Sequence, residues 1–310
     1  MVQVDPAAAT GLPEAIAHPG APARALRGQG FWASSWRRLR RDRLTLAAGL
    51  VFLLLCLMAL LADPINAFVL HRDPNAQALT NTYRAPSPEH WLGTDEYGRD
   101  SAARVIQASR VSLTMGFVVA VLALGVGVLV GLLAGVYGGW VDDLITFVVN
   151  LFSITPTFYV LLILAAWVPP SPLSLALLIA AFGWMGVARQ VRGVALSIGQ
   201  RDYVLAARAL GAGERRIVVR HVLPNVSSIV TVVAGLEVAG AILAESGLSF
   251  VGLGIRPPTP SWGNMLTNSL QYVFRDPWLV VVPGAFIFVT ILSVYLLADG
   301  LRDALDPRLR

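Results

Sequence analysis

The chain has 310 residues, of which 55% are hydrophobic and only 14% are charged. Soluble domains carry about 25% charged residues, so this composition favours a membrane protein. All 24 basic residues are arginine, and the formal net charge is +5. Without lysine the chain lacks the G-x-x-x-x-G-K-[ST] phosphate-binding loop, which excludes an ATPase of that class. A single cysteine, Cys56, excludes an intrachain disulfide.

The N-terminal residues 1–30 are rich in alanine, proline and glycine and show no apolar periodicity. Such a composition is typical of disordered chains, and we predict a disordered cytoplasmic arm over residues 1–35. The arm is not a signal peptide, because the first apolar stretch begins only near Leu44 and is too long for a cleavable one.

Six apolar stretches are long enough to cross a membrane. A hydrocarbon core about 30 Å thick requires about 20 apolar residues in a helix. The sequence therefore predicts an all-α, polytopic membrane protein with six transmembrane helices, whose even number places both termini on one side. The stretches are Leu44–Ala62, Ser112–Val136, Leu144–Val168, Leu173–Ala188, Ile229–Ala244 and Leu279–Ala298.

The distribution of arginine predicts which side is cytoplasmic, since cytoplasmic loops carry an excess of basic residues. The N-terminal arm through Arg43, residues 189–224 and the C-terminal tail together hold 17 arginines, and the two long loops on the other side hold seven. Both termini and residues 189–224 are therefore expected in the cytoplasm. The expected organisation is a first helix and external loop with an amphipathic helix (36–111), a core (112–300) and a cytoplasmic tail (301–310).

A stripe of small residues runs along the second span. Ala123, Gly127, Gly131 and Gly135 are four residues apart and fall on one face of the helix. Such a face lets a neighbouring helix approach closely. The stripe indicates either ordinary packing within the bundle or a sliding or partner interface.

Polar residues inside the spans are candidates for a translocation path. A carboxylate in a bilayer is costly and usually faces a water-filled cavity or a partner. Glu237 is therefore interpreted as lining a path or meeting a second subunit, with a structural hydrogen bond as the alternative. Glu245 lies at the edge of the fifth span, where it can reach the headgroups. Asn150 is a further path candidate, and with Pro156 it indicates a kink in the third span.

Catalysis and metal binding receive little support from the residues. The four histidines lie outside the spans and form no cluster with metal-ligand spacing. A metal site built from Asp95, Glu96 and Asp100 is one alternative, but turn and capping hydrogen bonds are favoured for these carboxylates. Asp100 or Ser101 is predicted to cap the external amphipathic helix. We expect this chain to be non-catalytic and to hold no metal or cofactor.

An arginine-rich island, residues 202–225, separates the fourth and fifth spans. Asp202 is predicted to cap a short helix through Ala209, a Gly211–Gly213 hinge breaks it, and a second helix from Glu214 ends before Leu223-Pro224. Small residues let a partner approach, and arginines pair with acidic groups. The island therefore predicts a docking element for a cytoplasmic motor. A headgroup-facing linker is an alternative, and a DNA-binding helix-turn-helix is disfavoured because neighbouring spans leave no free domain.

The island also resembles the E-A-A-x3-G-x9-I-x-L-P signature of permease subunits of binding-protein-dependent ABC importers. Here it reads Leu205-Ala206-Ala207, then Gly211 after three residues and Leu223-Pro224 at the family's spacing. Leu205 stands where the family has glutamate, and His221 stands where it has isoleucine. Leu205 cannot form the ionic contact that the family's glutamate could make with the motor. The glycine hinge and the spacing of the motif are those of the family.

Other stretches narrow the resemblance to the C-type subunit of the dipeptide/oligopeptide (and nickel) permeases. His90–Asp100 resembles the pattern H-x-L-G-T-D-x-x-G-R-D of that subunit. Ala244–Gly254 and Pro257–Gly263 resemble its segments after the fifth span. Together the resemblance covers residues 36–310 of the chain.

The resemblance implies the type I ABC importer permease fold and half of a translocation path for di- or oligopeptides across the bacterial inner membrane. It implies a second homologous permease, two cytoplasmic ATPases that hold the ATP and Mg²⁺, an external binding protein, and no nucleic acid. The competing hypotheses are an ion-coupled secondary transporter or channel that uses Glu237, and a membrane scaffold. The expected ATPase-docking residues are Tyr203, Ala206, Ala207, Arg208, Gly211, Ala212 and Arg215.

Overall fold

The computed structural model describes residues 31–169, 171–267, 271–274 and 276–305. In these residues the chain is helical, with one isolated bridge between Thr94 and Asp100, and the predicted all-α class is confirmed. The elements are α1 (Phe31–Arg41), α2 (Arg43–Leu60), α3 (Ala62–Pro64), η1 (Ile65–Leu70), η2 (Leu79–Asn81), α4 (Ser101–Tyr137), α5 (Gly139–Ile154), α6 (Thr157–Ala165), α7 (Pro172–Gly199), α8 (Asp202–Ala209), α9 (Glu214–Ile217), η3 (Val218–Val222), α10 (Leu223–Phe250), α11 (Trp262–Met265) and α12 (Trp278–Leu305).

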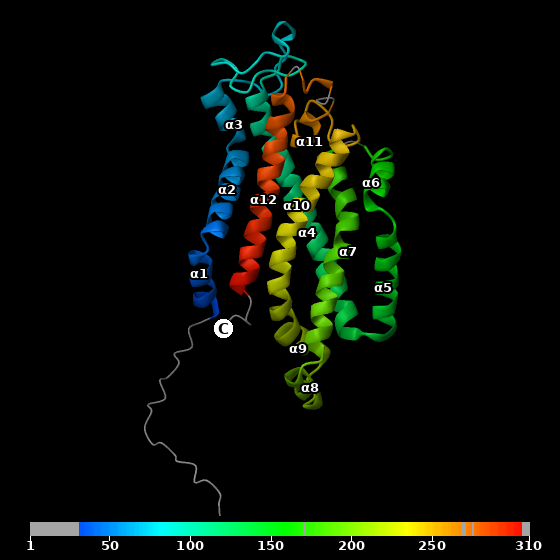
Figure 1. Ribbon diagram of the computed structural model, residues 1–310. Helices are drawn as coiled ribbons and strands as arrows, with labels where there is room; N and C mark the ends of the chain where they lie inside the picture. Colours follow the sequence, from blue (N-terminus) through cyan, green and yellow to red (C-terminus); the bar gives the residue numbers. More distant parts are fainter. Residues whose placement is uncertain (1–30, 170, 268–270, 275, 306–310) are drawn as a thin grey trace, which may run out of the picture.

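The long helices stand side by side in one bundle (Figure 1). The start of α1, the end of α12 and the short helices α8 and α9 lie at one end of the bundle, called here the terminal end. The connection from α3 to α4 and the connection from α10 to α12 lie at the opposite end, called the loop end. The arginine-rich island is thus on the same side of the bundle as both ends of the described chain.

Five helical segments of the described chain are long and apolar enough to cross a membrane: α2, α4, α7, α12, and the run Glu214–Phe250 that includes α10. The third predicted span is different, because α5 and α6 meet at an angle of 78°. Thr155 at the break is extended, with ψ of 130°. Proline disfavours the helical conformation in the residue before it, so Pro156 produces a break where a kink was predicted. Asn150 lies within α5, before the break.

Helix α4 begins 11 residues earlier than the second predicted span, at Ser101. The separate external amphipathic helix predicted here is therefore wrong, because these residues form the first turns of α4 itself. Ala102, Val105 and Ala108 are all buried in them, so the apolar face continues without interruption into the span. Asp100 caps the helix as predicted, with its Oδ1 accepting a hydrogen bond from the Ala103 N–H at 2.9 Å.

The small-residue stripe of α4 packs directly against α7. A Cβ added to Gly127 would lie 2.5 Å from Val187 Cβ, and one added to Gly135 would lie 2.5 Å from Ala195 Cβ. In lipid, helices associate through close packing because the tails are as apolar as the side chains. Packing within the bundle is therefore confirmed as a use of the stripe, and it joins α4 and α7 into one unit.

The ends of the chain differ from the predicted boundaries in two places. Residues 1–30 of the predicted disordered arm lie outside the described residues, and residues 31–35 form the beginning of α1. Helix α12 continues to Leu305, into the predicted tail, and residues 306–310 lie outside the described part.

Candidate functional site

The arginine-rich island folds as a tight helical hairpin at the terminal end of the bundle. Gly211 has a φ of +83°, a left-handed conformation that costs other residues about 1–2 kcal/mol. The Gly211 N–H donates to Arg208 O at 2.9 Å, and the Ala212 N–H donates to Ala207 O at 3.0 Å. These bonds end α8 and turn the chain into α9, so the glycine break lies where the sequence placed it.

Two details of the predicted hairpin are wrong. Asp202 is the first helical residue of α8 rather than its cap, since Arg201 holds the capping position without a side-chain bond. The second helix does not end before Leu223-Pro224, because α9 continues through the π-helical turns of η3 into α10. Pro224 is the second residue of α10, which directly follows the π-helical turns of η3. The hairpin is therefore continuous with a membrane-spanning helix.

Three apolar side chains anchor the hairpin to the bundle. Val204 of α8, Ile217 of α9 and Val222 of η3 are each at most 1% exposed. They form one cluster with Ile198 and Ala195 near the end of α7. Since the anchors come from both arms of the hairpin, a force applied to its outer surface is transmitted to α7 and α10 together.

The outer surface of the hairpin carries exposed leucines and, beside them, small residues. Leu210 is 89% exposed and Leu205 is 49% exposed, and Ala206 and Gly211 are exposed as well. An apolar surface outside the predicted spans is a candidate for contact with another protein. Tyr203 is also exposed, although its ring lies 5.7 Å from that of His221.

The two arginines expected to support docking have different surroundings. Arg208 forms a two-fold hydrogen-bonded pair with Glu214, with both N–O distances at 3.1 Å. This pair crosses from α8 to α9 and links the two arms of the hairpin, while 35% of the Arg208 side chain remains exposed. Arg215 and Ala212 lie beyond the turn, where Arg215 is exposed and Ala212 is half-buried.

Glu237 lies on the face of α10 that meets α7. A Cβ added to Gly183 of α7 would be 3.1 Å from Glu237 Oε2, and one added to Gly186 would be 3.9 Å from Oε1. The carboxylate therefore occupies space that these two glycines leave open. Glu237 is half-buried, and it has no hydrogen bond or ion pair within the part of the chain that the structure describes. Asn150, the other interior path candidate, is exposed on α5 and is not brought near it by any described contact.

Glu245 is completely buried, so the predicted reach to the headgroups is wrong. Its Oε1 accepts hydrogen bonds from Ser249 Oγ at 2.7 Å and from Ser261 Oγ at 2.8 Å. Those hydroxyls in turn accept from the backbone N–H groups of Ile255 and Asn264. Glu245 thus holds the loop after α10 and the start of α11 onto the bundle, which is a structural role.

The 90–100 stretch forms a folded turn on top of α4. Gly93 and Gly98 have φ of +73° and +70°, and a Cβ on Gly98 would lie 1.9 Å from Ala78 O. His90 Nδ1 lies 2.8 Å from Asp100 Oδ2, and Arg99 Nε donates to Asp95 Oδ2 at 2.6 Å. The turn and capping roles favoured for Asp95 and Asp100 are what the structure shows. Glu96 is half-buried at the rim, and burial raises the pKa of its carboxyl.

A polar link that the sequence did not predict joins α5 and α7. Arg192 of α7 donates two hydrogen bonds to the carboxylate of Asp142, one of them from its NH2 group to Oδ2 at 2.6 Å. One turn further, Arg189 donates to Ser153 Oγ at 2.6 Å. An acidic pair beside a two-glycine turn was the available signal, because the turn brings the start of α5 back toward α7.

Known proteins are similar to this chain over almost its whole length. Residues 127–310 match the family of binding-protein-dependent transport system inner membrane components, and residues 30–86 match the N-terminal TM domain of oligopeptide transport permease C. The oligopeptide transport system permease protein OppC of Mycobacterium tuberculosis (strain ATCC 25618 / H37Rv) is 38% identical, over 88% of this chain and 94% of its own length. The dipeptide transport system permease protein DppC of Bacillus subtilis is 37% identical over 90% and 87%, and the glutathione transport system permease protein GsiD of Pectobacterium atrosepticum is 34% identical over 90% and 92%.

Proposed function

Because the chain belongs to the family of binding-protein-dependent transport system inner membrane components, we propose that it is the permease subunit of an ATP-driven peptide importer. It is a multi-pass membrane protein without catalytic chemistry of its own. Its cargo is a di- or oligopeptide, as the names of the relatives suggest, with nickel and other small solutes as the competing cargo.

The hairpin formed by α8 and α9 is the observation that carries this proposal. It presents exposed leucines to the outside and is anchored by buried residues to both α7 and α10. Two ATPase subunits, which hold the ATP and Mg²⁺, dock on this surface and move it when they close. Because the anchors are rigid, that movement shifts α7 and α10 and biases the bundle between outward-open and inward-open states.

The arrangement of charge supports an orientation with the hairpin in the cytoplasm. The terminal end carries the basic turns of α1 and the arginines of α8 and α9. Basic residues are enriched on the cytoplasmic side of membrane proteins. Both termini therefore face the cytoplasm of the bacterium, and the loop end faces the external binding protein.

The translocation path lies between this chain and a second, homologous permease. Glu237 supports this placement, since a half-buried carboxylate in a span needs water or a partner beside it. Gly183 and Gly186 of α7 leave room for this carboxylate between the two helices. Glu245, by contrast, contributes to the fold and not to the path.

Uptake by two hairpin variants tests the docking surface. Gly211→Trp places a bulky ring on the outer surface and puts a non-glycine residue in a left-handed backbone conformation. Gly213 is the control position, because it has ordinary backbone angles and open space around it. We expect Gly211→Trp to abolish uptake of labelled dipeptide in a deletion strain, and Gly213→Ala to retain it. Both variants should insert normally, measured by the amount of protein in the membrane fraction. Normal uptake by Gly211→Trp would contradict docking at this surface.

Reconstitution in liposomes separates the importer from a secondary transporter that uses Glu237. The importer requires ATP and both partner types and is indifferent to an ion gradient. Transport by this chain alone, driven by a proton or sodium gradient and lost in Glu237→Gln, would favour the competing function. A scaffold without a path would copurify with the partners but support no transport in either assay.

A further inference from the structure

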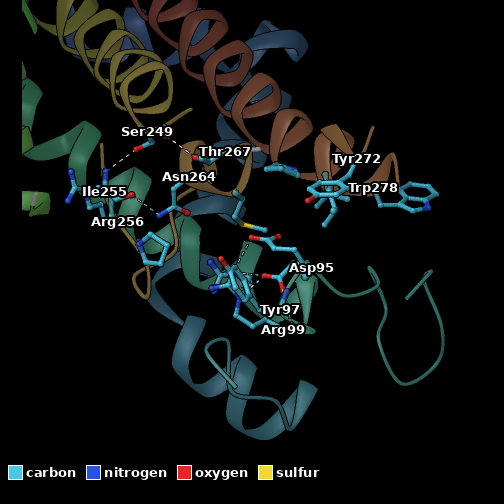
Figure 2. Close-up of a pocket in the computed structure, with 18 of the residues that line it drawn as sticks. Asp95, Tyr97, Arg99, Ser249, Ile255, Arg256, Asn264, Thr267, Tyr272 and Trp278 are labelled. Atoms are coloured by element: carbon cyan, nitrogen blue, oxygen red, sulfur yellow. Dashed lines mark hydrogen bonds and ion pairs between the residues drawn. The ribbon is translucent and has the colours of Figure 1, made fainter. Parts of the chain in front are cut away.

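A cavity of about 290 Å³ at the loop end is not used by the docking hairpin or by the path around Glu237. It is enclosed by the 93–101 turn with the start of α4, by the loop after α10 with α11, and by the start of α12. Figure 2 shows side chains from these segments around one space, with Asp95, Tyr97 and Arg99 grouped together, Arg256 on the loop that follows α10 and Asn264 on α11.

The polar wall of the cavity carries a buried cation, Arg104, that makes few hydrogen bonds within the described residues. Arg104 is 3% exposed, and within the described residues its guanidinium donates one hydrogen bond, to Pro74 O at 3.2 Å. The nearest carboxylate is Asp95, whose Oδ2 lies 3.5 Å from Arg104 Nε. That same oxygen is already 2.6 Å from Arg99 Nε, so the two guanidinium groups share it, and the NH2 group of Arg99 also lies 3.5 Å from Glu96 Oε1. A buried charge of this kind is stabilised only when an anion and further hydrogen bonds complete it.

Two more groups around the cavity would serve an anion. Ser101 is 4% exposed, and its Oγ has no hydrogen-bond partner within the described residues. Buried hydroxyls without a partner are rare, because each one costs about 1–3 kcal/mol. Arg256 lines the same cavity, is exposed, and makes no ion pair in the part of the chain that the structure describes. The lining thus holds three arginines, Arg99, Arg104 and Arg256, and two carboxylates, Asp95 and Glu96, which leaves one positive charge in excess.

The opposite wall is apolar. It consists of Leu279, Val282 and Pro283 from the first turns of α12, together with Met265. Leu279 and Val282 are each 8% exposed, so this wall is rigid and almost dry. A ligand that fits both walls carries an anionic group next to an apolar one.

We propose that this cavity binds the C-terminal residue of a short peptide, with the carboxylate at Arg104, Ser101 and Arg256 and the apolar side chain against α12. This proposal rests on the proposed function, since it makes the cavity a peptide site on the permease itself, separate from the external binding protein. The planar guanidinium matches a carboxylate with two parallel hydrogen bonds, so Arg104 and Arg256 are suited to bind such a ligand.

Equilibrium binding to the purified transporter complex in nanodiscs, without the external binding protein, tests the site. The probes are labelled Leu-Leu, Leu-Leu amide and free leucine. Leu-Leu should bind, and the amide should bind at least about tenfold more weakly because it lacks the charged acceptor. Arg256→Gln should weaken Leu-Leu binding by about threefold to tenfold. Arg72→Gln, which changes an exposed arginine of the same loop region outside the cavity, should leave it unchanged.

A variant that fills the cavity tests the binding of Leu-Leu in a second way. Val282→Phe should abolish Leu-Leu binding, and its thermal unfolding midpoint shows whether the complex remains folded. Because Arg256 is exposed, Arg256→Gln keeps the test informative even if Val282→Phe unfolds. No binding of Leu-Leu, equal binding of its amide, or an unchanged affinity in Arg256→Gln would overturn the proposal. Free leucine binding as tightly as Leu-Leu would also overturn it, by showing a site for free amino acids.

The proposed function has an independent readout. ATP-dependent uptake of Leu-Leu by the complete transporter with its binding protein tests import, whatever the cavity does. Import without binding at the cavity would overturn only the cavity proposal. Failure of ATP-dependent import of any peptide would overturn the proposed function itself.

Discussion

The tight contact between α4 and α7 can be tested by adding a single methyl group at Gly131. A Cβ at this position would lie 2.6 Å from Ala188 O and 2.8 Å from Val191 Cβ. Carbon atoms in contact normally lie about 3.5–4.0 Å apart, so the two helices must separate by about 1 Å at this level. Overpacking of this kind typically costs about 1–3 kcal/mol.

A matched control removes the change in helix propensity. Gly125 is on the same helix, is exposed, and has no atom within 4 Å of an added Cβ. Gly131→Ala and Gly125→Ala gain the same helix propensity, about 1 kcal/mol in water. The difference between the two variants therefore isolates the packing cost. We expect Gly131→Ala to be less stable than Gly125→Ala by about 1–3 kcal/mol.

The free energy of unfolding can be measured in detergent micelles by titration with SDS, with helicity followed by circular dichroism. Both variants should unfold in a single transition, with the midpoint of Gly131→Ala at the lower SDS fraction. Equal stability of the two variants would refute the reasoning. It would mean that α4 and α7 separate without cost, as expected of a sliding interface rather than of a packed unit.

Three further substitutions test the polar contacts. Glu245→Ala leaves two buried serine hydroxyls without their acceptor, so the free energy of unfolding should fall by about 2–5 kcal/mol, whereas Glu245→Asp should lose less. Arg192→Met breaks the link to Asp142 between α7 and α5. Because Arg192 is 31% exposed, the free energy of unfolding should fall by about 1 kcal/mol. A fall as large as that of Glu245→Ala would be inconsistent with this partial exposure. Arg110→Gln removes an ion pair with Asp63 in which both side chains are more than half exposed, so stability in 0.15 M salt should change by less than about 0.5 kcal/mol, and a larger fall would show that this pair is not screened.

The sequence by itself determined the class of protein, most of the spans and the location of the glycine-broken hairpin proposed for docking. Apolar length alone identifies a spanning helix, since every backbone polar group must be satisfied within the bilayer. The Gly211 break was equally visible, because a left-handed turn between two short helices needs glycine. The resemblance to the permease family was carried by spaced motifs, and the comparisons confirm it over most of the chain.

Only the tertiary structure decided which polar residues belong to the fold and which face outward. Glu237 and Glu245 have similar positions in the sequence, yet Glu245 is enclosed by serines from α10 and α11, whereas Glu237 faces the glycines of α7. The cavity at Arg104 depends likewise on segments more than 150 residues apart in the chain. Local pattern sets the helix and its face, but the partner of each polar group comes from whichever distant segment packs against it.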